Sequence, residues 1–428
     1  MTRYQQVFVV ALILGSLPSG EADAQQVSSV SELVAIALDR APEIQAARME
    51  IEAARGRVVQ ARLRPNPRVS SERREEVGGF DTQSMVSVEV PLDLFRRSGR
   101  LSTAERTADV IAQSVADRER LLAASVRSAA GLVLAGARRL SVLNDLIDLN
   151  RRFRDLLAAR VAQGGAAALE RDLAAVDVDR LEADRALQAG RVDAAMIDLK
   201  ALVGLAPDAP LALGMELEAV VRAEAATVGE AAPAAGALAA RPDVRESLER
   251  VRFAEAQLDE RRREARFDMS VYAGYMRMNA GFPQQGLSAA NALEPIRGLF
   301  HNVAVGVSVM VPLRNRNQGA IVAAEAERRG AERMQAAREL SVRAEMASAS
   351  VRDRQAHRSV EIYVSGARDL ARRNLDVVRQ SYELGRNTVF DVLAEQRRLL
   401  DFERAYTEAL AEAFDARTAL RRASGDVR

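Results

Sequence analysis

The sequence predicts a mainly α-helical fold with a small β part, built from two copies of one structural unit. All twelve prolines lie outside two stretches, 92–206 and 313–428, so each stretch can hold long uninterrupted helices. A shift of 221 residues aligns Val90-Pro91-Leu92 with Val311-Pro312-Leu313 and Gly164 with Gly385. A single register over so long a segment indicates an internal duplication.

Composition supports long helices and excludes several kinds of chemistry. The 428 residues include 60 acidic and 61 basic side chains, so the balance gives no preference for nucleic acid. The absence of cysteine excludes disulfides, thiolate catalysis and cysteine metal sites. With only two histidines and no glycine-rich phosphate loop, the sequence predicts no catalytic residue, no cofactor and no enzyme.

The N-terminus has the pattern of a secretory signal peptide. Arg3 precedes an apolar run over 7–17, and Ala22-Asp23-Ala24 provides a small-residue cleavage site. The run is too short for a transmembrane helix, which needs about 20 apolar residues. We therefore predict that residues 1–24 are removed and that the chain is secreted.

The first unit is predicted over 25–204. Ser29 and Glu32 have capping-box spacing and open a short helix to about Arg40, and Pro42 starts a second helix to about Leu63. Valines alternate with polar residues near residue 88, and period-two alternation indicates a half-buried strand. The remaining elements predicted for this unit are a strand pair over about 68–90, a helix over about 101–161, a break at Gly164-Gly165 and a helix over about 168–202.

The second unit is predicted over 241–428 and repeats this plan. Its elements are a helix from Pro242 to about 266, a strand pair over about 268–312, and helices over about 321–384 and 390–423 separated by Gly385. Residues 205–240, rich in alanine, proline and glycine, are predicted to link the units. Pro42 and Pro242 are 200 residues apart rather than 221, which leaves 21 extra residues that we assign to a loop at 279–300.

Four strands cannot close a barrel, because even small barrels need about eight. Three copies of the chain would supply twelve strands, and a closed β-barrel is the only strand-based structure that crosses a bilayer. Helices of about 60 residues would extend about 90 Å from that barrel. The sequence therefore favours a duct that crosses the outer membrane and reaches into the periplasm.

One motif supports this interpretation. Residues 382–393 read Tyr-Glu-Leu-Gly-Arg-Asn-Thr-Val-Phe-Asp-Val-Leu, and with the duplicated plan they make the mature chain resemble the TolC-type outer-membrane efflux channels. Within that family, Leu-Arg-Pro-Asn-Pro at 63–67 and Asn-Arg-Asn-Gln-Gly at 315–319 are similar to the cobalt–zinc–cadmium resistance (CzcC-type) branch.

The resemblance implies an assembly and a cargo. It implies a homotrimer in outer-membrane lipid, with a twelve-stranded β-barrel and a helical barrel that meets a periplasmic adaptor (membrane fusion protein) and an inner-membrane resistance–nodulation–division pump. The implied cargo is heavy-metal cations, and small organic drugs are the alternative. A periplasmic adaptor or a secreted coiled-coil protein is the rival class, but neither explains two full copies with valine-rich strands.

The resemblance also assigns roles to the two helical turns. Gly164, Gly165 and Gly385 supply the helix-ending conformation. The family plan then implies that these turns form the tip that meets the adaptor, together with neighbouring residues Ala166, Arg386 and Thr388.

Acidic residues follow both turns. Asp391 and its duplicate Glu170 stand in a first helical turn, where the helix dipole favours acidic side chains. The resemblance implies a pore-facing acidic ring for Asp391, whereas for Glu170 both interpretations stay open. The family's second acidic position is Ala394 and its gating arginine position is Asn387, so a latch is expected to use other contacts, such as Tyr382.

Two further residue types suggest metal ligands but are interpreted as structural. His301 and His357 lie apart, in a strand and a helix, without neighbouring ligands. Met269, Met276, Met278 and Met310 lie in or beside the predicted strands and are assigned to barrel packing. No metal site is predicted.

Overall fold

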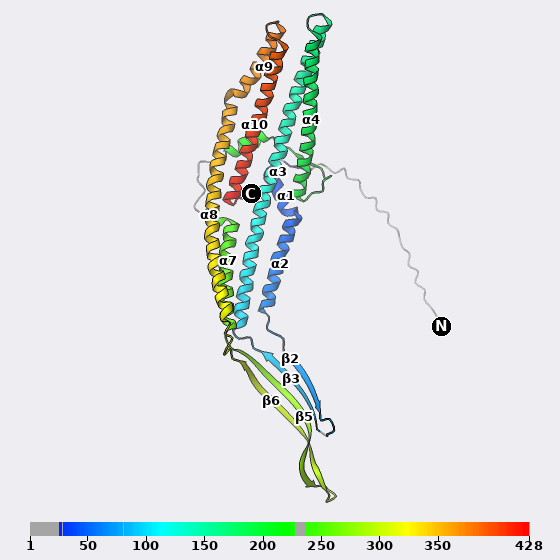
Figure 1. Cartoon of the computed structure of the whole chain (residues 1–428), viewed down its shortest axis with the longest axis vertical. Helices are drawn as coiled ribbons and strands as arrows, with labels where there is room; N and C mark the ends of the chain where they lie inside the picture. Colours follow the sequence, from blue (N-terminus) through cyan, green and yellow to red (C-terminus); the bar gives the residue numbers. More distant parts are fainter. Residues whose placement is uncertain (1–24, 28, 80, 227–235, 428) are drawn as a thin grey trace, which may run out of the picture.

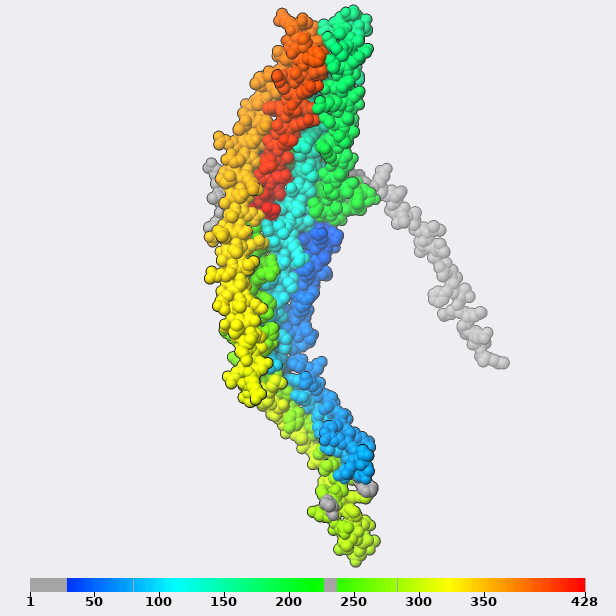
Figure 2. All heavy atoms as spheres, in the orientation of Figure 1, coloured from blue at the N-terminus to red at the C-terminus, as the bar shows by residue number. Residues whose placement is uncertain are grey.

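The computed structural model describes residues 25–27, 29–79, 81–226 and 236–427, so the predicted signal peptide lies outside the described residues. The molecule is long and narrow, with a helical body that ends in two turns and a sheet at the opposite end (Figure 1). In Figure 2 the sheet forms the thin lower end, and no helix covers it in this view.

The first half follows the predicted order closely. Its elements are β1 (Gln25–Val27), α1 (Val30–Arg40), α2 (Pro42–Arg62), β2 (Arg68–Glu75), β3 (Thr82–Pro91), α3 (Arg96–Ala162) and α4 (Ala168–Val203). The Ser29 hydroxyl accepts a hydrogen bond from the Glu32 backbone N–H at 3.2 Å, which confirms the predicted cap of α1.

The second half repeats this order, which supports the duplication inferred from the sequence. Its elements are α7 (Pro242–Glu264), β5 (Asp268–Leu287), β6 (Leu293–Met310), α8 (Gln318–Ile362), a π-helical turn (Tyr363–Ala367), α9 (Arg368–Glu383) and α10 (Val389–Ser424). Both halves therefore combine a helix, a strand hairpin and a long helical hairpin.

The prediction of a continuous helix over 321–384 is wrong at one point, near residue 365. The backbone leaves helical geometry at Ser365 and Gly366, and Gly366 has a φ of 110°. α3, the corresponding helix of the first half, runs without a break over 67 residues. A glycine inside a helical pattern was the available signal, because only glycine adopts such a φ without strain.

The loop predicted at 279–300 is also wrong, because most of these residues extend the second hairpin. β5 and β6 pair as far as Leu287 and Leu293, and the chain reverses within residues 288–292. The extra residues therefore carry β5 and β6 well beyond the ends of β2 and β3, as Figure 1 shows. Period-two alternation is weak in this segment, so only the pairing reveals the strands.

The segment predicted as a linker contains structure that joins the halves. β4 (Leu211–Leu213) pairs in parallel with β1, and α5 (Leu217–Ala226) and α6 (Ala237–Ala240) follow. Leu217 and Val221 of α5 belong to the main buried cluster, where helices of both halves meet. The largest fully buried apolar side chains of this cluster are Leu33, Val34, Val126, Leu199, Leu217, Tyr406, Leu410 and Phe414.

The four long strands form one antiparallel sheet in the order β2-β3-β5-β6. β2 and β6 are its edges, and neither edge has a partner strand within the described residues. Unpaired edges invite pairing with another chain. A stretch of α3 is as apolar as a transmembrane helix, but 61% of it is buried within the helical body.

Candidate functional site

Each helical hairpin reverses at a glycine with a positive φ. Gly164 has a φ of 74° and Gly385 a φ of 72°, and both turns lie at the end farthest from the sheet. The N–H of the next residue donates to a helical carbonyl in each turn, from Gly165 to Arg160 at 2.8 Å and from Arg386 to Ser381 at 2.9 Å. This bonding pattern is that of a Schellman cap, and it is the same in both copies.

The residues beside these turns are accessible. Gly164, Gly165, Arg386 and Thr388 are exposed, whereas Ala166 and Asn387 are half-buried. Leu169 and Phe390, equivalent in the two copies, are 64% and 62% exposed. The tip thus presents two apolar side chains at matching positions, in addition to the polar residues named from the sequence.

Tyr382 connects the two hairpins at the tip. Its hydroxyl donates a hydrogen bond to Glu170 Oε2 at 2.7 Å, from α9 to the first turn of α4. Its ring packs edge-on against Phe153 of α3 at 5.5 Å between ring centroids, and the Arg160 guanidinium lies over it at 5.3 Å. Burial, followed by the hydrogen bond to Glu170, raises the pKa of Tyr382 to about 12, so the hydroxyl remains a donor at neutral pH.

Asp391 caps its own helix. Its carboxylate accepts hydrogen bonds from the Thr388 backbone N–H and hydroxyl, both at 2.8 Å, and the Thr388 hydroxyl accepts one from the Asp391 N–H at 3.3 Å. These hydrogen bonds lower the pKa of the fully exposed Asp391, which keeps it charged. Glu170 binds Tyr382 instead, so the two duplicate acidic residues have different local partners.

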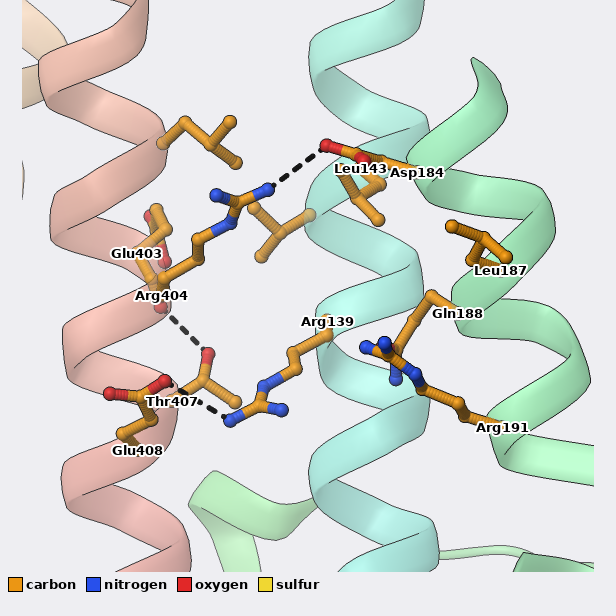
Figure 3. A pocket seen from close by; sticks show the side chains of 12 residues that line it. Arg139, Leu143, Asp184, Leu187, Gln188, Arg191, Glu403, Arg404, Thr407 and Glu408 are labelled. Carbon is orange, nitrogen blue, oxygen red and sulfur yellow. Dashed lines mark hydrogen bonds and ion pairs between the residues drawn. The ribbon is translucent and has the colours of Figure 1, made fainter. Parts of the chain in front are cut away.

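A groove lies between the hairpins below the tip (Figure 3). Two ion pairs cross it, Arg404 to Asp184 at 3.2 Å between α10 and α4, and Arg139 to Glu408 at 3.4 Å between α3 and α10. It has a volume of about 300 Å³, and its other lining residues are Val142, Leu143, Leu187, Gln188, Arg191, Leu400, Glu403 and Thr407. Charges of both signs therefore join the hairpins at this level, beside an apolar cluster in which Leu143 of α3 and Leu399 of α10 are buried together.

The two faces of the sheet differ in chemistry. On one face the register aligns Val88 with Val69 and Ala273, and Ala273 with Val305. The valines of this face stay exposed, with Val303 and Val305 at about 75%. We call it the valine face; its other apolar members are Val86, Val90, Val271, Val307 and Val309.

The opposite face is concave and mostly polar or small. A hollow on this face is lined by Arg68, Ser70, Met85, Ser87, Glu89, Tyr272, Gly274, Met276, Asn302, Ala304 and Ser308. Alternating apolar and polar faces along each strand are typical of membrane β-barrels, with lipid outside and a polar lumen. The sheet geometry therefore agrees with the alternation found in the sequence.

Two apolar stripes run along the two sides of the helical body. One stripe lies on α4 and consists of the exposed side chains of Leu169, Val176 and Leu187. The other follows α9 to the residue after its end and consists of the exposed side chains of Leu370, Val377 and Leu384. Figure 1 shows α4 on the same side as the edge strand β2, and α9 on the side of β6. Each side of the chain thus carries both an apolar stripe and an open strand edge.

The histidines occupy separate places. The Tyr275 hydroxyl lies 2.5 Å from His301 Nδ1, and His357 Nδ1 lies 2.9 Å from the Asp353 carbonyl oxygen. Among the described residues, no group of three His, Cys, Asp or Glu side chains could hold a metal ion. Of the four methionines named from the sequence, the strand register places Met276, Met278 and Met310 on the concave side and Met269 on the valine side.

The sequence did not predict the hydrogen bond between Tyr382 and Glu170. The two residues are 212 positions apart, and the duplication aligns Glu170 with Asp391 rather than with Tyr382. Sequence reasoning also did not pair Arg404 with Asp184 across the groove. Charged residues are abundant on these helices, so their pairing depends on the helix arrangement alone.

Comparisons with known proteins agree with this architecture. Residues 33–205 match the family model "Outer membrane efflux protein". The cobalt-zinc-cadmium resistance protein CzcC of Cupriavidus metallidurans is 24% identical over 384 residues, covering 89% of this chain and 86% of the relative.

Solved structures share the fold. The structure of CusC is similar with a TM-score of 0.74 at 15% identity, covering 92% of both chains. The open state of the Neisseria gonorrhoeae MtrE outer membrane channel is similar with a TM-score of 0.74 at 18% identity, covering 92% of this chain and 88% of MtrE. At these identities the likeness concerns the fold alone.

The fold, the two sheet faces and these matches lead to one assignment. They agree with the fold of outer membrane channels rather than with an adaptor or a coiled-coil protein. Residues 33–205 match the outer membrane efflux protein family, and the chain as a whole shares the fold of solved outer membrane channels.

Proposed function

We propose that three copies of this chain form the passive exit channel of a tripartite efflux system for heavy-metal cations. The observation that carries this proposal is a sheet with an apolar and a polar face and two open edges, at the end of a long helical body. Such a chain is incomplete alone, because its edges and its valine face both need covering.

The two sides of the chain suggest how copies join. β2 and the α4 stripe lie on one side, and β6 and the α9 stripe on the other, so contact between copies is head to tail. Head-to-tail contacts generate a closed ring when the rotation closes. Three copies of the four-stranded sheet give twelve strands, enough for a barrel with an aqueous lumen.

The helical body suits a conduit through the periplasm. α3 has 67 residues and is therefore about 100 Å long, several times the thickness of a membrane. The tip of this body would meet a periplasmic adaptor fed by an inner-membrane pump. The residues we assign to that contact are Gly164, Gly165, Ala166, Gly385, Arg386 and Thr388.

We assign gating to the tip. The hydrogen bond from Tyr382 to Glu170 holds the two hairpins of one protomer together and would act as a latch of the closed state. Asp391 is charged and fully exposed, so three copies would form an acidic ring that attracts cations. Asn387, half-buried beside Thr388, lies at the tip and carries no charge, so it cannot form the ion pair that an arginine would form there.

Similarity to a cobalt-zinc-cadmium resistance protein supports metal cations as cargo. The test is growth of a deletion strain on cobalt, zinc, cadmium, copper and a panel of organic drugs, with and without the restored gene. Rescue on metals alone would support the proposal. Rescue on drugs alone would retain the channel and reject the metal cargo.

The membrane topology is tested with two neighbouring substitutions in β6. Val305 lies on the valine face and Ala304 lines the concave hollow. We expect Val305→Arg to lose insertion and rescue, because an arginine facing the bilayer midplane costs about 2–4 kcal/mol. Ala304→Arg, which would face the lumen, should insert and rescue. Equal behaviour of the two variants would contradict the assigned faces.

A further inference from the structure

A row of polar and basic side chains crosses the valine side of the sheet beyond its last apolar row. The register aligns Arg73 with Ser84, Ser84 with Arg277 and Arg277 with His301. All four side chains are exposed. We call Arg73, Arg277 and His301 the distal cation row, after the guanidinium groups of its two arginines.

The height of this row on the sheet matches a membrane boundary. Near the helical body, Phe267 packs edge-on against Phe95 at 5.2 Å between ring centroids, and the Arg266 guanidinium lies over Phe95 at 5.3 Å. Aromatic residues with basic neighbours are typical of the edge of the apolar band. From Phe267 to Arg277 the strand rises about 34 Å, or roughly 26 Å across a membrane at a 40° tilt.

That height is close to the 25 Å of the apolar band in outer-membrane barrels. The distal cation row therefore lies where the valine face ends, on the side away from the periplasmic helices. This is the head-group level of the outer leaflet. Tyr275 lies one row below and stacks on His301 with 5.9 Å between ring centroids, as an aromatic residue does at this boundary.

The charge of the row is only partly neutralised within the chain. Arg73 donates to Glu75 at 2.6 Å, which offsets one positive charge. The Arg277 guanidinium makes no hydrogen bond or ion pair within the described part of the chain, and the residue is exposed. The nearby Glu72 lies on the concave face, where Arg74 donates to it at 2.6 Å. Arg277 thus offers an unopposed guanidinium above the valine face.

We propose that the distal cation row binds the phosphate groups of outer-leaflet lipids. A guanidinium binds phosphate through two parallel hydrogen bonds, and the His301 ring, with Nδ1 held by Tyr275, leaves Nε2 for a second contact. The row spans three strand spacings, about 14 Å, so it can contact more than one phosphate. The acyl chains of the same lipid would cover the valines below.

This binding site goes beyond transport, because it concerns how the channel is held in its membrane. It rests on the closed barrel proposed above, which turns the valine face toward lipid. Phosphate is the shared chemistry of several ligands, but the apolar rows directly below the cations favour a lipid over a free ion.

The test uses the full-length channel purified in detergent, with bound lipid counted by native mass spectrometry. The probes are a bis-phosphorylated glucosamine glycolipid and the same glycolipid without phosphates. The variants are Arg277→Gln and the double change Arg277→Gln with His301→Gln. The matched control is Arg74→Gln, which removes a cation from the opposite face of the same sheet end.

We expect the phosphorylated lipid to bind roughly fivefold more weakly after Arg277→Gln, and more weakly still in the double variant. Arg74→Gln should bind as the parent does, and the dephosphorylated lipid should bind all proteins weakly. Equal binding of the two lipids, or no loss in the variants, would overturn the proposal. Complete displacement of the lipid by millimolar inorganic phosphate would also overturn it, in favour of a free-anion site.

Size-exclusion chromatography separates this proposal from the proposed function. Variants that remain trimers but lose the phosphorylated lipid support the distal cation row specifically. A parent chain that forms no trimer would overturn the proposed channel, and with it the lipid-facing position of the row.

Discussion

Replacing Tyr382 with phenylalanine removes one hydroxyl from the tip and little else. The ring keeps its edge-on contact with Phe153, while the donor to Glu170 is lost. Because the Tyr382 side chain is only 6% exposed, water replaces the lost partner poorly on the tyrosine side. We therefore expect Tyr382→Phe to weaken the contact between the two hairpins without unfolding either of them.

The size of the effect follows from the bond. Hydrogen bonds to charged acceptors contribute about 1.5–3 kcal/mol, and the partly accessible Glu170 argues for about 1.5 kcal/mol. That value changes the ratio of open to closed tips roughly tenfold for each protomer. If three protomers open together, the ratio changes by up to about a thousandfold. The two outcomes distinguish independent from concerted opening.

Single-channel recording in planar bilayers measures this ratio directly. Tyr382→Phe should increase the open fraction, and Glu170→Gln should have a smaller effect because the amide oxygen still accepts the hydrogen bond. The double variant should equal Tyr382→Phe alone, since the two residues share one interaction. An unchanged open fraction in Tyr382→Phe, with normal trimers, would refute the latch.

The pH dependence of the latch has a definite sign. The pKa of Tyr382 is raised from 10.0 to about 12, so its contribution is fully present below pH 10 and is lost as the pH rises through about 12. Deprotonation of Tyr382 therefore does not open the channel near neutral pH. Channel opening between pH 6 and pH 9 that is present in the parent chain and absent in Tyr382→Phe would contradict this expectation.

Three further predictions concern other parts of the chain. Asp391→Asn should lower the preference for cations in single-channel recordings and leave trimer assembly intact; unchanged selectivity would remove Asp391 from the pore. Arg241→Ala should destabilise the helical body by roughly 3 kcal/mol in chemical denaturation, because it leaves the buried carboxylate of Asp243 with Arg338 at 3.3 Å as its nearest cation. Burial raises the pKa of Asp243, but the hydrogen bond and charge of Arg241 outweigh this effect, so the pKa lies below its usual value of 3.8. The stability that this pair contributes is therefore present above pH 3.8 and is lost as the pH falls. Thermal melting at pH 7 and at pH 3 will measure the loss. Gly366→Ala should cost about 1–2 kcal/mol in the same assay because φ is 110° there, whereas Gly330→Ala, in a regular part of α8, should not destabilise.

Local chemistry explains why much of the fold could be predicted from the sequence. Prolines start α2 and α7, glycines end α3 and α9, and alternating valines mark β3 and β6. These signals act within a few residues, so they do not depend on distant parts of the chain. Because the sequence is duplicated, each local pattern occurs twice. Gly164 and Gly385, for example, both have a positive φ at equivalent turns.

The site could be predicted only in part. The sequence itself indicated the turns, the acidic residue after each turn and the strands with alternating valines. It did not indicate that Tyr382 would meet Glu170, that Arg404 would cross to Asp184, or that Arg73, Arg277 and His301 would share one row. These partners lie on separate elements, and their meeting depends on the angle between hairpins and on the strand register. Helix propensity and alternation are set by neighbours in the chain, whereas register and hairpin contact are set by which large apolar surfaces are buried together, and only the tertiary structure decides that.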